Sequence, residues 1–256
     1  MIEAGFRYDV GDIKCTVFSD GTLVSQELGG EDVFGLNCLF VDSGDHKILI
    51  ETGSGEGFQP TAGRLLHNLE AAGISCSDID IIIFSHCHID HVSGTCDSQG
   101  KPVFPNARYI TTKSEWTYLE MGPGTNEMQN FFFDYARKNL LPLADLFDLA
   151  EDNTEVLPGI KFISAPGHTT GNSMVEITSG ENRLLCIGDI VHSQLEFVEP
   201  EHASLFDVTP EQALDTRARI LSDAARSGVL VFACHFQFPG LGYIKQKADV
   251  LTWQPI

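Results

Sequence analysis

Four side chains that can bind metal ions lie within six residues of the sequence, at His86, His88, Asp90 and His91. They directly follow the apolar run 81–84. In an extended segment, residues two positions apart point to the same side, so His86, His88 and Asp90 can face one point. A turn after Asp90 would bring His91 to a neighbouring point. Because imidazole and carboxylate donors suit zinc and similar divalent ions, this spacing predicts a metal site with room for two ions.

Three further candidate ligands follow apolar runs that are typical of strands. His168 follows a Pro-Gly pair, Asp189 follows a glycine that allows close backbone approach, and His235 follows the last short apolar run. Each residue alone is a weak signal, because loop residues are commonly polar. Together with the first cluster, they place five histidines and two aspartates at four strand ends, which predicts one shared site.

The elements that must position these residues alternate along the chain between short strands and helices. The expected strands cover 14–18, 36–41, 47–51, 79–84, 107–111, 160–163, 173–178, 184–187 and 229–233. The expected helices cover 61–72 with Thr61 as cap, 113–120, 126–150 with a break at Pro142, and a segment from Thr209 to Gly228. Strands that end in polar loops predict two packed sheets flanked by helices, in a single domain over residues 1–256.

The composition limits the classes of function. The 256 residues include 36 acidic and 16 basic side chains, which gives a formal net charge of -20. Such a charge repels nucleic acid and anionic membrane surfaces, so the chain is expected to bind neither. There is no apolar run of the ~18 residues that would span a bilayer, and the start lacks a secretory signal, so a cytoplasmic location is expected.

The seven scattered cysteines favour reduced, buried thiols over a disulfide framework. Cys87 and Cys234 each adjoin a candidate ligand. In an extended backbone their side chains should point away from the metal site, which predicts a packing role for both.

These motifs, in their order along the chain, resemble the five metal motifs of the metallo-β-lactamase superfamily, over about residues 14–243. The resemblance implies an α/β protein, an αββα sandwich of two mixed β-sheets flanked by helices. It places the metal site at one edge, between the sheets. It also implies that one ion is held by His86, His88 and His168, that a second is held by Asp90, His91 and His235, and that Asp189 bridges both.

Within the superfamily, the chain is most similar to the branch of methyl parathion hydrolase and quorum-quenching lactonases. Segments 97–107, 188–192 and 235–242 carry this likeness. Two positions depart from the usual pattern: Glu51 replaces an aspartate after an early strand, and Asn172 replaces the second histidine of the Pro-Gly-His motif. Both positions lie outside the family's ligand set, so the departures bear on tuning of the site.

His192 lies three residues after Asp189, where related lactonases often carry Tyr and the methyl parathion hydrolase branch carries His. It is a candidate for a catalytic hydrogen bond to the substrate oxygen or the leaving group. A solvated loop histidine is an equally good interpretation. The aromatic group 131–135 is expected in the core or a homodimer interface rather than in a pocket wall, whereas Phe238 is expected to line the site.

The resemblance implies a metal-dependent hydrolase in which a hydroxide bridging two divalent ions cleaves a small-molecule lactone or carboxylic ester. Zinc is the first expectation for both ions, with iron or manganese as alternatives. Asp90 and His192 are the candidate catalytic residues. A phosphotriester is the second substrate class, and a dioxygenase that uses one iron on the same scaffold remains a different possible function.

Overall fold

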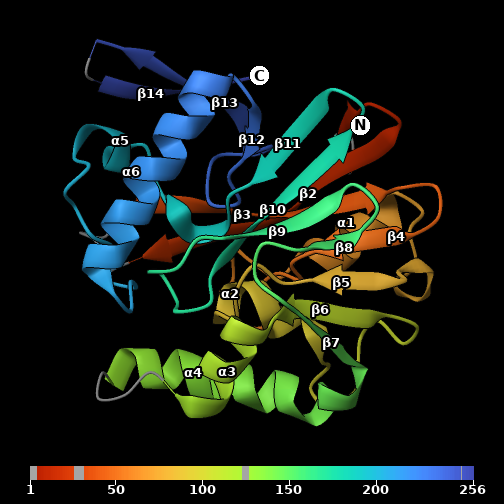
Figure 1. Ribbon diagram of the computed structural model, residues 1–256. Coiled ribbons are helices and arrows are strands. Elements are labelled where there is room, and N and C mark those ends of the chain that lie inside the picture. Colours follow the sequence, from red (N-terminus) through yellow and green to blue (C-terminus); the bar gives the residue numbers. More distant parts are fainter. Residues whose placement is uncertain (1–4, 26–31, 123–126, 249) are drawn as a thin grey trace.

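The computed structural model describes residues 5–25, 32–122, 127–248 and 250–256 (Figure 1). Its strands form two seven-stranded mixed sheets, ordered β1-β2-β3-β4-β5-β6-β7 and β14-β13-β12-β11-β10-β9-β8. The strands are β1 Phe6–Val10, β2 Ile13–Ser25, β3 Asp32–Asp42, β4 Lys47–Ile50, β5 Ile81–Ile83, β6 Arg108–Thr112, β7 Phe147–Ala150, β8 Glu155–Leu157, β9 Ile160–Ser164, β10 Ser173–Ser179, β11 Asn182–Cys186, β12 Leu230–Phe232, β13 Leu241–Lys247 and β14 Val250–Pro255. The helices are α1 Leu65–Ala71, η1 Cys76–Asp78, α2 Ile89–Val92, η2 Ser93–Thr95, α3 Lys113–Met121, α4 Glu127–Leu140, η3 Leu141–Leu146, η4 Gly188–Ile190, α5 Leu195–Val198 and α6 Pro210–Ser227.

The elements stack in four layers, with helices outside and both sheets inside. Figure 1 shows α3 and α4 along one side of the molecule and α6 along the other. One apolar cluster packs the first sheet against α1, α3 and α4, a second fills the space between the sheets, and a third packs the second sheet against α5 and α6. This arrangement confirms the predicted αββα sandwich.

Strand β5 shows how the sequence specifies these layers. Successive side chains of a strand point to opposite faces, so Ile82 packs in the outer cluster while Ile81 and Ile83 pack between the sheets. Strands that are covered on both faces need an unbroken apolar run, which the sequence provides here. The run stops at Phe84, where the chain leaves the sheet for the edge that carries the candidate ligands.

Both sheets contain parallel neighbouring strands whose carboxyl ends lie near that edge. β4, β5 and β6 are parallel neighbours in the first sheet, and β11 and β12 are parallel neighbours in the second. The carboxyl ends of parallel strands meet at one edge, where α/β proteins bind their ligands. The loops after β5, β11 and β12 therefore reach the same place from different parts of the sequence.

Two helix predictions need correction. Helix α1 begins at Leu65, and Thr61 does not cap it; the Thr61 hydroxyl instead donates to the carbonyl of Thr22. The helix expected over 126–150 ends at Leu140, because Pro142 leads into η3, and Phe147 lies in the edge strand β7. Its expected start at residue 126 lies outside the described residues.

Helix α6 follows its prediction at both ends. Pro210 occupies its first turn, and Gly228 ends it in the left-handed conformation with φ of 62°. Thr209 is the N-cap residue but makes no side-chain capping bond. Within the described part of the chain, the helices all lack the length and apolar character needed to cross a bilayer.

Candidate metal centre

The first four candidate ligands lie where β5 gives way to α2. His86 and His88 precede α2, and His88 has the extended conformation of an N-cap residue. Asp90 was expected in an extended segment followed by a turn, but Asp90 and His91 both belong to the helix itself. The early start of α2 is what separates His91 from its neighbours and turns it toward a second group of donors.

The other three candidate ligands arrive from the second sheet. His168 lies in the loop after β9, Asp189 in η4 after β11, and His235 just after β12. Gly167 has φ of 136°, and a Cβ there would lie 2.3 Å from the backbone nitrogen of Ala213. Only glycine therefore allows this loop to pack against α6 and present His168 to the site.

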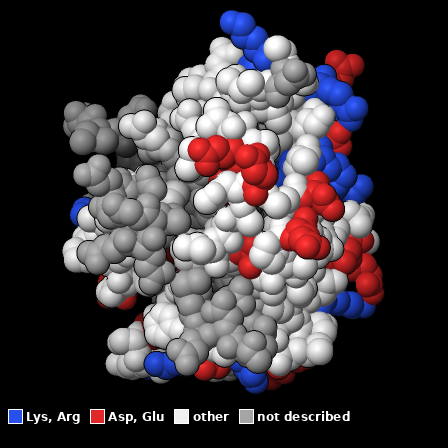
Figure 2. Space-filling model, turned by 90° about the vertical axis from the view of Figure 1, so that its left-hand side faces the viewer, with Lys and Arg blue, Asp and Glu red and all other residues white. Residues whose placement is uncertain are grey.

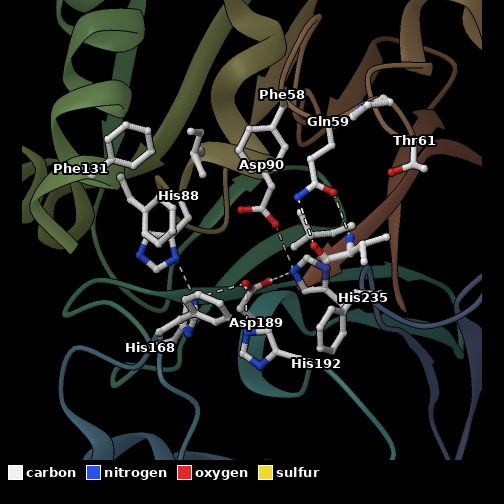
Figure 3. A pocket seen from close by; sticks show the side chains of 17 residues that line it. Phe58, Gln59, Thr61, His88, Asp90, Phe131, His168, Asp189, His192 and His235 are labelled. Carbon is white, nitrogen blue, oxygen red and sulfur yellow. Dashed lines mark hydrogen bonds and ion pairs between the residues drawn. The ribbon is translucent and has the colours of Figure 1, made fainter. Parts of the chain in front are cut away.

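Asp189 lies at the centre of the cluster and faces both groups of imidazoles (Figure 3). Its Oδ2 is 3.6 Å from His86 Nε2 and 3.2 Å from His168 Nε2. Its Oδ1 is 3.1 Å from His91 Nε2 and 3.0 Å from His235 Nε2. One carboxylate thus presents one oxygen to each group.

The remaining two residues complete the two groups. His88 Nδ1 lies 2.8 Å from His168 Nε2, which adds it to the first group. Asp90 Oδ2 lies 3.6 Å from His91 Nε2 and 3.5 Å from His235 Nε2, which adds it to the second. The structure therefore brings together all seven side chains, hereafter the metal-ligand cluster: His86, His88, Asp90, His91, His168, Asp189 and His235.

The spacing of these donors fits a metal ion. Four donors about 2.1 Å from a zinc ion at tetrahedral angles lie about 3.4 Å from one another. The distances above, from 2.8 Å between His88 and His168 to 3.6 Å, bracket that value. In addition, the Nε2 atoms of His86, His91 and His235 are buried without a hydrogen-bond partner. Such atoms are costly unless a cation or proton satisfies them, so the residues present fit the ions that the family implies.

The charge of Asp189 also favours a cation at this position. Burial raises the pKa of the Asp189 carboxyl, but imidazoles led by His235 and His91 outweigh it and hold that pKa well below its usual range. Burial lowers the pKa of His91 and His235, yet the charge of Asp189 raises both well above the usual value. The ionised Asp189 therefore attracts positive charge to the point where the groups meet.

A cavity of about 750 Å³ opens directly over the cluster. His88, Asp90, His168, Asp189 and His235 form its polar floor. Most of its remaining lining, hereafter the apolar wall, consists of Leu23, Val24, Phe34, Phe58, Phe131, Phe132 and Phe206. The lining includes no Lys or Arg among the described residues.

The wall corrects two predictions about aromatic residues. Phe133 packs in the core as expected, but Phe131 and Phe132 line the cavity, because helical spacing turns neighbouring residues to different sides of α4. The Phe132 ring centre lies 6.2 Å from that of His88. Phe238 is 43% exposed and is not among the described lining residues; Phe34, 6.4 Å from His235, takes that place.

His192 lies beside the cluster and lines the cavity. Its Nε2 is 3.4 Å from Asp189 Oδ2, and its Nδ1 is 3.6 Å from Glu196 Oε1. Burial lowers its pKa, but hydrogen bonds to Asp189 and Glu196 outweigh burial and raise the pKa to about 10. The His192 side chain is 11% exposed, so it lies partly buried at the cavity floor between two carboxylates and is not a solvated loop residue.

The prediction for one residue that contacts the cluster was wrong. Cys234 was expected to point away, but its Sγ lies 3.5 Å from Asp189 Oδ1 because β12 has already ended. Cys87 does pack in the outer core, as predicted. Glu51 accepts the backbone N–H of Ser85, and its other oxygen lies 3.6 Å from His91 Nδ1. The longer side chain at position 51 thus still supports the cluster.

Glu115 and Asn172 hold the loops behind the cluster. The buried Glu115 carboxylate accepts the backbone N–H of Cys87 and, at 2.6 Å, the hydroxyl of Thr169. Asn172 donates to the carbonyl of Ala165 at 2.8 Å, so it supports the turn that carries His168. Neither role could be read from local sequence, since each partner is distant in the chain or in a loop.

Comparison with known proteins agrees with this fold and site. A model of the metallo-beta-lactamase superfamily matches residues 32–235, and the chain belongs to this superfamily. Among curated proteins, the N-acyl homoserine lactonase AiiA of Bacillus thuringiensis subsp. kurstaki is 23% identical over 218 residues, which covers 77% of this chain and 80% of that protein. This protein is thus a member of a metallo-hydrolase superfamily with lactonase relatives and a His/Asp metal site.

Two solved structures are similar over nearly the whole chain. The first is AidC, a dizinc quorum-quenching lactonase in complex with a product; it has a TM-score of 0.91 and 26% identity, and the match covers 98% of this chain and 97% of AidC. The second is AbOPH, a hydrolase of the beta-lactamase superfamily, with a TM-score of 0.89 and 27% identity over 100% of this chain and 98% of AbOPH.

Proposed function

We propose that this protein is a dinuclear metal-dependent hydrolase that opens a neutral lactone or carboxylic ester carrying an apolar arm. The position of Asp189 carries this proposal, because its two oxygens face two separate groups of donors. His86, His88 and His168 would hold one ion and Asp90, His91 and His235 the other, with Asp189 shared. The lactonase activities of AiiA and AidC support the substrate class.

The cavity supports a neutral substrate. An anionic group away from the metal ions would need another cationic partner, and the described lining offers no Lys or Arg. Figure 2 shows one face of the molecule on which Asp and Glu gather near the middle, whereas Lys and Arg lie mainly towards the edges. Burial of the substrate's apolar arm against the apolar wall would stabilise the complex by about 25 cal/mol for each Å² of apolar surface removed from water.

In the mechanism, bound divalent ions would supply Lewis acidity and a water of lowered pKa. The protein would contribute placement and proton transfer. The apolar wall would orient the substrate so that its carbonyl lies over the floor. His192 would donate a hydrogen bond or proton from Nε2 to the substrate oxygen that becomes the alcohol, and Asp90, 13% exposed at the cavity floor, would accept the proton released by the attacking water.

Metal analysis combined with a substrate screen tests this proposal. The protein should contain two divalent ions per chain, with zinc as the first expectation, and should hydrolyse acyl lactones or aryl esters until a chelator removes the ions. Faster hydrolysis of phosphotriesters would favour the second substrate class, which the same uncharged cavity could hold. A single bound iron, together with oxygen uptake and no hydrolysis, would replace the proposal with the dioxygenase.

A further inference from the structure

Helix α6 buries an arginine among apolar residues. Arg217 is 2% exposed and lies on the same helix face as the buried residues Ala213, Ile220 and Ala224. Arginine is almost never fully buried unless its charge is paired. An apolar residue would fit this face at lower cost, so the partners of Arg217 should explain its presence.

The guanidinium of Arg217 contacts η4, α5 and the segment between α5 and α6. Its Nε donates to the carbonyl of Ile190 at 2.9 Å, and one terminal nitrogen donates to the carbonyl of His202 at 2.6 Å. The other terminal nitrogen lies 2.8 Å from Glu196 Oε1 and 3.8 Å from Asp207 Oδ2. One side chain thus connects two buried carboxylates.

Each of these carboxylates faces one imidazole at the site. Asp207 Oδ1 lies 3.0 Å from His168 Nδ1, and Glu196 Oε1 lies 3.6 Å from His192 Nδ1. Glu196 Oε2 also accepts the backbone N–H of His192 at 2.5 Å. In both histidines, the Nδ1 contact leaves Nε2 directed at Asp189.

We propose that Arg217 is a positioning residue which, through Asp207 and Glu196, fixes the ring orientations of His168 and His192. A carboxylate on the far nitrogen sets the tautomer and the angle of a histidine that faces a metal. Arg217 offsets part of the negative charge of the two carboxylates and holds them in place. This inference rests on the metal site described under the proposed function.

The ionisation of Glu196 agrees with this arrangement. Burial raises the pKa of its carboxyl, but His192 and Arg217 outweigh burial and lower the pKa to about 2. Without Arg217, two carboxylates would share a buried region that has lost its cation, and they would tend to move apart or take up protons. Either change would release the imidazoles they orient.

The Arg217→Met variant tests the role, with Arg219→Met as matched control. Arg219 lies on the same helix but is exposed, and its guanidinium lies 3.5 Å from the carbonyl of Ser164. Zinc affinity is measured by competition with a chromophoric chelator, and turnover on a lactone is measured separately. We expect Arg217→Met to weaken zinc binding by about 10- to 100-fold and to lower kcat, and Arg219→Met to change neither.

Two further variants separate positioning from a merely structural role. Asp207→Asn should weaken zinc binding about 10-fold or more because it loosens His168, whereas Glu196→Gln should lower kcat about 10-fold and leave zinc binding unchanged. Arg217→Lys should restore only part of the wild-type affinity, because an ammonium group lacks the planar fork. If Arg217→Met does not fold, the Asp207→Asn and Glu196→Gln variants still test the positioning role.

The outcomes are distinguishable. Wild-type zinc affinity and kcat in Arg217→Met, Asp207→Asn and Glu196→Gln, with only a lower melting temperature, would overturn the inference and leave Arg217 as a stabilising residue. A wild-type protein that binds no metal would instead overturn the proposed function itself.

Discussion

The metal-ligand cluster and the apolar wall face the same cavity but are built differently. Cluster residues such as His86 and His168 are almost fully buried and follow strands that pack in the apolar clusters. Wall residues come from α4, from loops, from the end of β2 and from β3, and Phe131 remains 61% exposed. The candidate ligands thus lie among closely packed elements, whereas part of the wall lies on elements with fewer packing constraints.

Replacing the central carboxylate should have the largest effect. Asp189→Ala removes the one residue that faces both donor groups, so we expect fewer than two bound ions per chain and a loss of kcat/KM of at least about 10³-fold. Elemental analysis and steady-state kinetics on one preparation measure both quantities. An active variant that keeps two ions would show that Asp189 does not join the two halves of the cluster.

The contribution of Glu115, which lies behind the cluster, to the free energy of unfolding should depend on pH. Burial raises the pKa of Glu115 to about 7, above its usual 4.5. The folded protein therefore holds an additional proton between these values, and the stability this gives is lost as the pH rises through about 7. Glu115→Gln stays neutral, so its free energy of unfolding relative to wild type should rise by about 2–3 kcal/mol from pH 5 to pH 8.

Urea unfolding at a series of pH values measures this difference, with both proteins in the same metal state. The exposed Glu70→Gln variant is the control for the removal of one surface carboxylate. A constant offset for Glu115→Gln would mean that Glu115 stays ionised in the folded protein.

A variant of His192 distinguishes a role as proton donor from a role as metal ligand. His192→Ala should lower kcat about 10²-fold by removing a proton donor, while the metal content stays at its wild-type value. Kinetics together with metal analysis check this expectation. Loss of an ion from the variant would make His192 a ligand and extend the cluster by one residue.

Truncation of the wall should have the smallest effect and should alter selectivity. Phe132→Ala should raise KM about 10-fold for lactones with long acyl chains and leave short-chain substrates unchanged, since burial of an aromatic ring contributes about 1.5 kcal/mol or more. Phe238→Ala is the matched control, because this ring is also partly exposed but is not among the described lining residues. An equal loss on short and long substrates would show that the wall supports the cluster and does not select the arm.

Local sequence patterns were enough to predict much of the fold. The run at β5, the glycine at the end of α6 and the strand ends before His168, Asp189 and His235 all lie where their local signals placed them. The prediction failed where tertiary contacts outweighed local preference. Thr61 bonds to the β2 backbone instead of capping α1, and Phe147 pairs with β6 instead of continuing a helix.

The sequence by itself determined which residues could bind metal, because donor type and close spacing are local properties. The family resemblance already implied that Asp189 lies between the two donor groups. Only the tertiary structure decided that Cys234 and Arg217 belong to the site's surroundings and that Phe131 and Phe132 form a wall. The physical reason is that these relationships depend on the packing of two sheets and two helical layers. That packing brings together side chains separated by up to two hundred residues, and no local pattern encodes their distances.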